Sequence, residues 1–235
     1  MDTLFPNDAR MLPQANAGQT NASFLLVRRL YWALRRNLVR RQLLVFVHDG
    51  GLPHQPASST TPVISISAAG PKSVSLADAI DRQSDLKRAI ILARLAAGHR
   101  IVHANASDGR LLAWGWIALP GAPTLLNWEA GLRLEIDAGS GYLFDFETLP
   151  AARNYGIYRR LLDHAARHCM AQGAKQVGVY CREENEASRR GILAAGFTGP
   201  KTLSVLRLGP FFRVAAPNHS YTGWLMASVP LAGMF

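Results

Sequence analysis

The sequence predicts a mixed α/β protein built around one central, mostly antiparallel sheet with helices on its faces. Two turn signals favour antiparallel pairing, because Ser107-Asp-Gly109 and Gly139-Ser-Gly141 each separate two runs that resemble strands. A third observation is the stretch 141–173, which passes from an apolar strand pattern through a turn into an amphipathic helix. With 235 residues, we expect one main domain.

Composition sets limits on the class of protein. The chain is 49% hydrophobic and 18% charged, which is ordinary for a globular protein. Its two cysteines, Cys169 and Cys181, are too few for a disulfide framework and fit a reducing compartment. No secretory signal and no uncharged window of about twenty residues is found, so we expect a cytoplasmic protein. A peripheral contact with the inner face of the membrane is the alternative.

The net charge of +10 is concentrated in one segment. Six arginines lie between Arg28 and Arg41 as three pairs, interleaved with leucines at helical spacing, which predicts a basic amphipathic helix. Such a helix could contact an anionic membrane or dock an acidic acyl carrier protein. Alternatively, its leucines pack on the domain and its arginines are solvated. Nucleic acid is not expected, because no recognisable nucleic-acid-binding motif accompanies the charge.

Short apolar runs bounded by turn residues predict the strands of the first half. Residues 43–47 form an apolar run, and residues 63–67 alternate as an edge strand does. Residues 75–97 have a helical pattern with an interruption near Gln83. The next two predicted strands are residues 100–106 and 110–118. Residues 120–128 are predicted to form a loop.

The second half repeats the alternation of strands and helices. A predicted hairpin joins 132–136 to 141–148, and the next helix ends at Gly173. The elements predicted after it are a strand at 175–181, a helix at 185–195 and a strand at 202–208. The domain division expected from these patterns is a disordered segment 1–22, a basic helix with short strand and linker 23–62, the main domain 63–210 and an apolar tail 211–235.

The turn before the helix at 157 is suited to holding an anion. The first backbone N–H groups of a helix have no partner within the helix, and the helix dipole adds positive potential there. Gly156 lies at this junction and has no Cβ to block a phosphate. An ordinary connection between strand and helix is the alternative reading of this signal alone.

Two separated motifs carry a resemblance to a known family. Pro150-Ala-Ala-Arg-Asn-Tyr-Gly-Ile-Tyr158 is similar to an Arg/Gln-x-x-Gly-x-Gly/Ala pyrophosphate loop preceded by proline. Asn185-Glu-Ala-Ser188, followed by Ala195-Gly-Phe197, is similar to an Asn-containing helix that ends in Gly-Phe. In this order, and on these predicted elements, residues from about 100 to 208 resemble the GNAT superfamily of acyl-CoA-dependent N-acyltransferases.

The resemblance implies an acyl-CoA donor, most simply acetyl-CoA, and no metal. It implies that backbone N–H groups of the loop cradle the pyrophosphate of coenzyme A, while Asn185 holds the pantetheine arm. The alternative for Asn185 is a helix N-cap. The coenzyme-binding residues expected on this basis are Thr148, Leu149, Arg153, Asn154, Tyr155, Gly156, Ile157, Tyr158, Asn185 and Ser188.

The chain departs from the family pattern at two positions. Tyr158 stands where the loop usually ends in Gly or Ala, and it would crowd the phosphates unless it points into the seam between helix and sheet. Ile192 stands where many members have the tyrosine that protonates the leaving thiolate. Tyr180, Ser188 or a water could substitute for it, and the sequence does not choose between them.

The chemistry requires a group that helps to deprotonate the amine. An alkyl ammonium has a pKa near ~10, so a carboxylate, often acting through water, is expected. Glu147 and Asp145 are the candidates, because their spacing places them on one face of a strand. As a pair they would raise the pKa of one partner; alternatively, one of them only pairs with an arginine. A backbone N–H freed near Thr148 could polarise the thioester oxygen.

The leading interpretation is an N-acyltransferase, most simply an N-acetyltransferase, that works by direct transfer to a primary amine in a ternary complex. A resemblance of its basic N-terminal segment to bacterial GNAT-like enzymes favours an amino sugar of cell-surface polysaccharide assembly as the acceptor. The alternatives are transfer of longer acyl groups from an acyl carrier protein docked on the arginines, and a non-catalytic acyl-CoA-binding module. His164 and His168 have zinc-compatible spacing but lack a third ligand nearby.

Overall fold

The computed structural model describes residues 38–50, 63–67, 71–83, 88–122, 125–127, 132–208, 211–216, 219–224 and 228–230. The chain divides into two compact units, Met1–Leu38 and Val39–Phe235. All of the described residues except Leu38 therefore belong to the second unit. None of the described helices is both long and apolar enough to cross a membrane.

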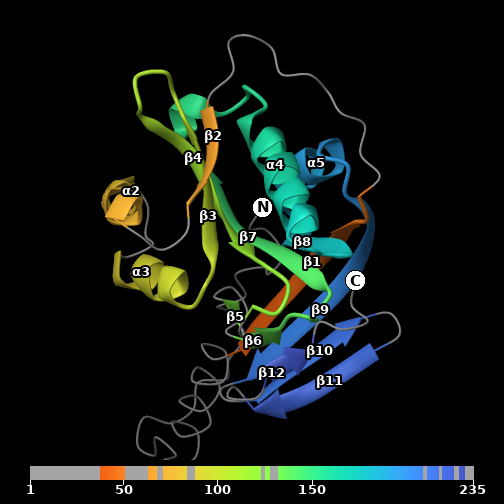
Figure 1. Ribbon diagram of the computed structural model, residues 1–235. Coiled ribbons are helices and arrows are strands. Elements are labelled where there is room, and N and C mark those ends of the chain that lie inside the picture. Colours follow the sequence, from red (N-terminus) through yellow and green to blue (C-terminus); the bar gives the residue numbers. More distant parts are fainter. Residues whose placement is uncertain are drawn as a thin grey trace, which may run out of the picture. The chain divides into compact units, whose positions relative to one another are not determined.

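A nine-stranded sheet runs through the second unit in the order β11-β10-β9-β1-β8-β7-β4-β3-β2 (Figure 1). Its strands are β1 Leu38–His48, β2 Val63–Ser67, β3 Arg100–Asn105, β4 Leu111–Ala118, β7 Ser140–Thr148, β8 Gln176–Arg182, β9 Thr198–Leu208, β10 Phe211–Ala216 and β11 His219–Trp224. β7 and β8 run parallel, whereas β2–β3, β3–β4, β4–β7, β8–β1, β9–β10 and β10–β11 are antiparallel pairs. The expectation of a mostly antiparallel sheet is confirmed.

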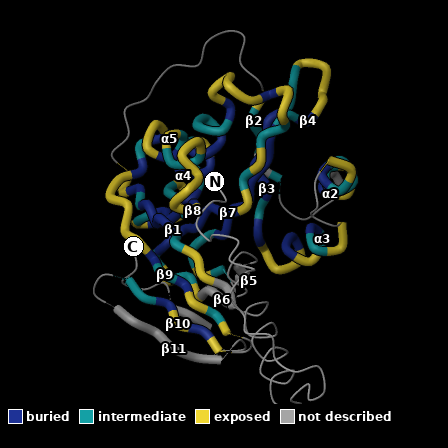
Figure 2. Tube along the Cα trace, turned by 180° about the vertical axis from the view of Figure 1, so that it is seen from behind, coloured by how far each residue is buried: buried dark blue, intermediate teal, exposed yellow. Residues whose placement is uncertain are grey.

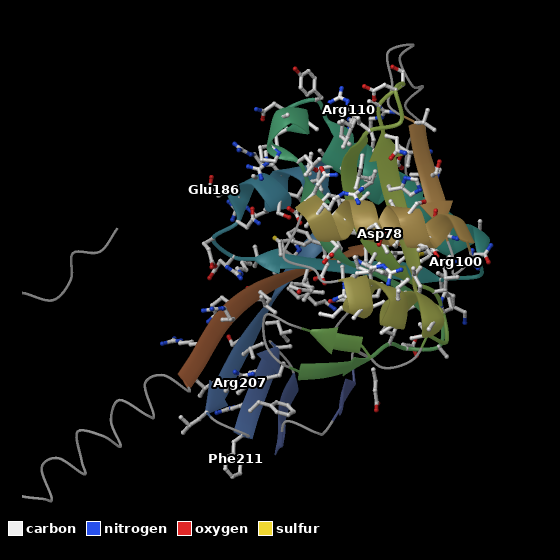
Figure 3. All side chains as sticks on the ribbon, turned by 90° about the vertical axis from the view of Figure 1, so that its left-hand side faces the viewer. Asp78, Arg100, Arg110, Glu186, Arg207 and Phe211 are labelled. Atoms are coloured by element: carbon white, nitrogen blue, oxygen red, sulfur yellow. The ribbon has the colours of Figure 1, made fainter. Side chains whose placement is uncertain are left out.

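Helices cover both faces of this sheet. They are α2 Pro71–Gln83, α3 Arg88–Ala96, α4 Ile157–Ala171 and α5 Glu186–Ala194. The pair α2 and α3 lies on one face, and the pair α4 and α5 lies on the other (Figure 1). Asp78 of α2, labelled in Figure 3, joins the first pair through an ion pair of 2.6 Å with Arg88 of α3.

The middle strands are apolar on both sides because helices cover both of their faces. Trp114 and Trp116 of β4 pack into the core beneath α2 and α3, whereas Ile117 packs into the core beneath α4 and α5. Buried residues accordingly run along the middle strands (Figure 2). Helix α4 connects the parallel neighbours β7 and β8, and Leu161 and Ala165 on its apolar face are buried.

Most of the predicted elements are present. The edge strand at 63–67, the helices that separate after Gln83 and the hairpin around Ser107-Asp-Gly109 are confirmed. The helix before Gly173, the strand after it and the helix that follows Asn185 are confirmed as well. These segments have strong local periodicity and clear end signals, so their sequences define them without tertiary information.

The predicted basic helix is wrong at its C-terminal end. The chain is already in β1 from Leu38, so Arg40 and Arg41 lie on a strand. β1 lies between β8 and β9 in the sheet, and this pairing outweighs the helical spacing of its leucines. Residues 28–37, which carry the remainder of the predicted helix, lie outside the described residues.

The predicted hairpin between 132–136 and 141–148 is also wrong. β6 Leu132–Glu135 pairs with β5 Leu125–Asn127 and with β12 Ser228–Pro230 in a separate three-stranded sheet. β7 cannot accept β6, because β4 and β8 occupy its two edges. Residues 120–128, which were expected to form a loop, contain the strand β5. The tail from Phe211 contains three further strands, β10, β11 and β12.

Candidate active site

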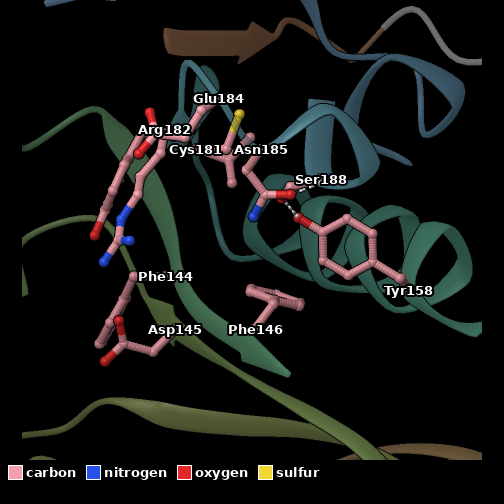
Figure 4. A pocket seen from close by; sticks show the side chains of 11 residues that line it. Phe144, Asp145, Phe146, Tyr158, Cys181, Arg182, Glu184, Asn185 and Ser188 are labelled. Atoms are coloured by element: carbon pink, nitrogen blue, oxygen red, sulfur yellow. Dashed lines mark hydrogen bonds between the residues drawn. The ribbon is translucent and has the colours of Figure 1, made fainter. Parts of the chain in front are cut away.

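A cleft opens where β7 and β8 part. The two strands pair only from Ser140 to Leu143 on β7 and from Gln176 to Val179 on β8, yet both continue for several residues. A cleft of about 450 Å³ lies in this region (Figure 4). Its lining consists of Phe144, Asp145, Phe146, Tyr158, Val179, Tyr180, Cys181, Arg182, Glu184, Asn185 and Ser188.

A β-bulge in β7 accompanies the separation of the strands. The register with β4 jumps between Trp116↔Phe144 and Trp114↔Glu147, and Asp145 has a φ of 48°. The ring of Phe146 packs directly against Gly115 of β4. A Cβ at Gly115 would clash with that ring, so the glycine makes room for it. A bulge bends and twists its strand, so β7 turns away from β8 at this point.

The bulge gives the cleft two different walls. Phe144 packs with the core beneath α2 and α3, whereas Phe146, two residues later, packs with the core beneath α4 and α5. The wall on the α4 and α5 side is uncharged, with Phe146, Tyr158 and Ser188. The wall on the other side carries Asp145 and Tyr180. The lining of the cleft therefore includes residues from both faces of the sheet.

A candidate anion cradle lies at the start of α4. The chain leaves β7 through the short 3-10 helix Pro150–Ala152, and Asn154 and Gly156 both have a φ of 68°. The hydrogen bond from Arg160 N to Gly156 O begins the ladder of α4. The N–H groups of Ile157 and Tyr158 precede it, receive no side-chain cap and have no acidic residue beside them in the first turn. A Cβ on Gly156 would stand in open space, so a phosphate fits there.

The remaining predicted loop residues surround this cradle. Arg153 is exposed, and its Nε donates to Thr148 O at 3.2 Å, so its side chain stabilises the turn. Tyr155 is 76% exposed. Leu149 N donates to Leu112 O at 3.0 Å, so Leu149 supplies no freed N–H. Successive N–H groups along a strand point to opposite edges, which directs the N–H of Thr148 toward the edge that β8 has left.

Tyr158 points away from the cradle and into the seam between α4 and α5. Its hydroxyl lies 2.7 Å from Ser188 Oγ, and its ring meets Phe146 edge-on at 6.1 Å between centroids (Figure 4). Gly191 of α5 makes room for the ring. Burial raises the pKa of Tyr158 to about 12, so its hydroxyl keeps its proton at neutral pH.

Replacing Gly191 with alanine should destabilise the protein, although alanine alone favours a helix over glycine by about 1 kcal/mol. The added Cβ would clash with the ring of Tyr158, which Phe146 and Ser188 hold in place. Overpacking costs roughly 1–3 kcal/mol, so a net loss of about 1 kcal/mol is expected in urea unfolding. In a Tyr158→Leu background the substitution should instead stabilise; the same sign in both backgrounds would contradict this packing.

Asn185 of the second motif both caps a helix and lines the cleft. Its Oδ1 accepts from Ser188 N at 3.0 Å, which makes Asn185 the N-cap of α5. The same side chain lines the cleft, so its amide nitrogen can donate to a ligand. Ile192, which stands at the position of the missing tyrosine, is fully buried and cannot act as an acid.

The two candidate carboxylates have different surroundings. Asp145 lines the cleft, and its Oδ2 accepts a hydrogen bond from Nη2 of Arg94 at 2.6 Å. Asp145 is therefore the carboxylate that pairs with an arginine, which was one of the two alternatives expected from the sequence. Glu147 lies opposite Trp114 and is exposed on the same face of the sheet. It stands beyond the lining of the cleft, toward the end of β7.

The structure thus brings part of the predicted site together. Asp145, Tyr158, Asn185 and Ser188 share the cleft, while the loop residues form the cradle at its edge. Sequence reasoning missed Phe144, Phe146, Arg182, Glu184 and Arg94. The strand that ends just before Asn185 could have indicated Arg182 and Glu184, but no sequence signal connects Arg94 with Asp145. In the described part of the chain, no three His, Cys, Asp or Glu side chains gather as metal ligands.

Comparisons with known proteins agree with this geometry. Residues 74–197, more than half of the chain, match the model of the acetyltransferase (GNAT) family. The chain is similar to a GNAT-family acetyltransferase from Colwellia psychrerythraea, at 17% identity and a TM-score of 0.52, with 77% of this chain and 61% of that chain covered. It is also similar to a GCN5-related N-acetyltransferase from Sphaerobacter thermophilus, at 14% identity and a TM-score of 0.50, with 88% and 59% covered.

The chain spans about three fifths of the length of these two structures, and at such identities the likeness shows the fold. No protein of curated function matches the sequence.

Proposed function

Because the chain belongs to the acetyltransferase (GNAT) family, we propose that it transfers an acyl group, most simply acetyl, from acyl-CoA to a primary amine by direct attack. The observation that carries this proposal is the cleft between the parted ends of β7 and β8, which adjoins the cradle at the start of α4. A donor with a phosphate end and an acyl end needs such a combination. An acceptor can reach the same cleft from the opposite face of the sheet.

The residues on the α4 and α5 side fit coenzyme A. The N–H groups of Ile157 and Tyr158 would hold its pyrophosphate, with Gly156 allowing close approach. The amide nitrogen of Asn185 would donate to the pantetheine arm. When bound, the coenzyme supplies the acyl group as a thioester. The N–H of Thr148 faces the gap between the strands and would stabilise the negative charge that develops on the thioester oxygen.

Proton transfer on the acceptor side is assigned to Glu147, acting through water. Asp145 instead forms an ion pair with Arg94 through its Oδ2. The neutral amine attacks the thioester carbon, a C–N bond forms and the C–S bond breaks. The proton lost by the amine passes through water to Glu147, and the sulfur leaves as a thiolate that needs a proton.

Tyr158 is the proposed source of that proton. It reaches the cleft from α4 rather than from the position of Ile192 on α5, and Ser188 orients its hydroxyl. Burial raises its pKa to about 12, so the phenol holds its proton at neutral pH. The phenolate formed by donation to the thiolate would recover a proton through Ser188 or water.

Replacing Tyr158 with phenylalanine should lower kcat by roughly a hundredfold, because general acids contribute about 10²–10⁴-fold. The affinity for acetyl-CoA should remain unchanged, since the ring and its packing are kept. Steady-state kinetics with acetyl-CoA, together with calorimetry, would measure both effects. Ser188→Ala should have a smaller effect on kcat in the same direction. An unchanged kcat in Tyr158→Phe would exclude Tyr158 as the donor.

The proposed function is tested by binding and by turnover. Calorimetry should detect acetyl-CoA binding, and mass spectrometry of the purified protein should show whether an acyl-CoA co-purifies and how long its acyl chain is. A panel of primary amines, including amino sugars, would then be screened for acylation. Absence of acetyl-CoA binding would refute the proposal, whereas binding without turnover on any amine would favour a non-catalytic acyl-CoA-binding module.

The finer expectations about the acceptor and the donor depended on other segments. The amino-sugar acceptor rested on the basic N-terminal segment, of which residues 28–37 lie outside the described residues. The acyl carrier hypothesis rested on the arginine segment, of which Arg40 and Arg41 are exposed on β1. Charge-reversing substitutions at these two positions should weaken transfer from an acyl carrier protein more than transfer from acetyl-CoA, and equal losses would remove the carrier hypothesis.

A further inference from the structure

One face of β9 and β10 carries large apolar side chains that are exposed. Leu206 is 44% exposed, Leu208 40% and Phe211 51%. Leu208 lies opposite Phe211 in the antiparallel pair, so these side chains share one face. Val205 and Val214, on the other face, are buried in the core beneath α2 and α3, and buried and exposed residues alternate along both strands (Figure 2). An antiparallel sheet with one face in the core usually has polar residues on its other face, so the apolar side chains require an explanation.

Arginines flank these apolar side chains on the same face. Arg213 of β10 lies opposite Leu206 and is exposed. Arg40 of β1 is exposed as well, and the alternation along a strand places it on the same face as Gln42. The hydroxyl of Ser204, two residues before Leu206, donates to Oε1 of Gln42 at 2.8 Å, which joins the two strands on this face. We define the basic apolar face as Arg40, Leu206, Leu208, Phe211 and Arg213.

The strands around this face carry no acidic side chain. Residues 9–48 and 187–235 contain no aspartate or glutamate. These two segments include the whole of β1, β9, β10 and β11. The positive potential of the arginines is therefore not compensated within these four strands, and the face is complementary to a negatively charged partner.

We propose that the basic apolar face docks on the surface of an anionic membrane. Negatively charged phospholipid headgroups attract lysine and arginine side chains close to the surface. Leucine and phenylalanine side chains enter the boundary between headgroups and acyl chains. An anionic bilayer thus accommodates both kinds of side chain that this face exposes. The proposal goes beyond acyl transfer and does not depend on it.

Other partners fit this face less well. A two-fold contact with a second copy uses the same patch twice, so it would bring the arginines of both copies together without an acidic partner. Nucleic acid would attract the arginines, but leucine side chains neither stack on bases as aromatic rings do nor donate hydrogen bonds to them. An acidic protein would have to present acidic and apolar groups in a matching pattern, whereas a fluid bilayer supplies both without one.

The test uses the burial of both cysteines. Cys169 and Cys181 are buried, so a cysteine introduced at the surface can be labelled selectively with the fluorophore NBD, whose emission rises in apolar surroundings. Phe211→Cys places the label on the basic apolar face. Val63→Cys places it on β2, at the opposite edge of the sheet, where Val63 is 61% exposed. The whole chain is then mixed with phosphatidylcholine vesicles that either contain or lack phosphatidylserine.

We expect the emission of the label at position 211 to rise severalfold with vesicles that contain phosphatidylserine and to change little with phosphatidylcholine alone. The label at position 63 should respond to neither. No response at position 211 would overturn the proposal, even if the chain binds the vesicles through another segment. Equal responses at both positions would overturn it too. A response at position 211 only to an acidic acyl carrier protein, or only to a higher concentration of the chain itself, would assign the face to a protein partner instead.

Unlabelled variants separate the apolar contribution from the charge, with vesicle co-sedimentation as the measurement. Phe211→Ser should weaken binding to phosphatidylserine vesicles roughly tenfold, because it removes a large apolar side chain from the contact, whereas Val63→Ser should leave binding unchanged. Arg40→Glu should weaken binding roughly tenfold at about 0.1 M salt and less at higher salt, where charges are screened.

Arg110→Glu is the matched control for net charge. Arg110 is exposed on the hairpin between β3 and β4, far from Phe211 in the second unit (Figure 3). The control should bind the vesicles nearly as the unaltered chain does. Equal losses in Arg40→Glu and Arg110→Glu would show that only the net charge matters and would contradict docking through this face.

Discussion

Replacing Gly156 with valine should weaken acetyl-CoA binding by roughly a hundredfold, which corresponds to about 2.7 kcal/mol. Gly156 has a φ of 68°, in the left-handed region, and the position of its missing Cβ is open. A valine side chain would occupy the space into which a phosphate must come to reach the N–H groups of Ile157 and Tyr158. Each hydrogen bond to a charged group contributes about 1.5–3 kcal/mol, so loss of one or two accounts for the effect.

Gly173 provides a matched control at the other end of the same helix. It has a φ of 90°, and the position of its Cβ is equally open. Gly173→Val should therefore have a similar backbone cost, roughly 1–2 kcal/mol, without blocking the cradle. Urea unfolding should show comparable destabilisation of both variants, and calorimetry should show weaker acetyl-CoA binding only for Gly156→Val. Equal affinities for acetyl-CoA in the two variants would show that this loop does not bind the pyrophosphate.

The segments that the sequence predicts well are those whose information is local. The turn at Gly156, the cap at Asn185 and the apolar face of α4 each depend on residues within one or two helical turns. The direction of Tyr158 is different, because it depends on the missing side chain of Gly191 in another helix. Its sequence neighbours alone therefore could not distinguish a ring that blocks the cradle from one that lines the cleft.

Long-range pairing explains the parts that could not be predicted. The spacing of Asp145 and Glu147 suggests one regular strand face, but the bulge at Asp145 moves Phe144 and Phe146 to opposite faces. The bulge in turn depends on Gly115 of the neighbouring strand, which makes room for the ring of Phe146. β6 was assigned to the wrong partner for a similar reason, since its own sequence does not reveal that both edges of β7 are occupied.

The same comparison applies to the carboxylates. From the sequence, Asp145 and Glu147 are expected to act together because they share one strand. Their roles differ because Arg94 on α3 forms an ion pair with Asp145. Four strands, β3 to β6, lie between Arg94 and Asp145 in the chain, and an isolated arginine on an amphipathic helix is usually solvated. Its burial over Trp116 and Phe144 is a property of the assembled core.

Replacing Glu147 with glutamine should lower kcat/KM for an alkylamine by about 10²–10⁴-fold near neutral pH, as expected for loss of a general base. The substitution keeps the size of the side chain, and Glu147 is exposed opposite Trp114, so stability should change little. Acetyl-CoA affinity should be unaffected, because the cradle lies at the start of α4. Kinetics and calorimetry on the same preparation would measure these quantities.

The deficit of Glu147→Gln should shrink as the pH rises. The neutral fraction of an alkylamine increases tenfold per pH unit until the pH reaches ~10, so the need for a base falls in that range. Tyr158 remains protonated there because its pKa is raised to about 12, and the proton donor is therefore constant. The exposed Glu183 follows β8 outside the lining of the cleft, and Glu183→Gln should behave as the unaltered protein at every pH. A deficit in Glu147→Gln that is independent of pH would contradict its function as the base and would indicate a role in positioning the acceptor.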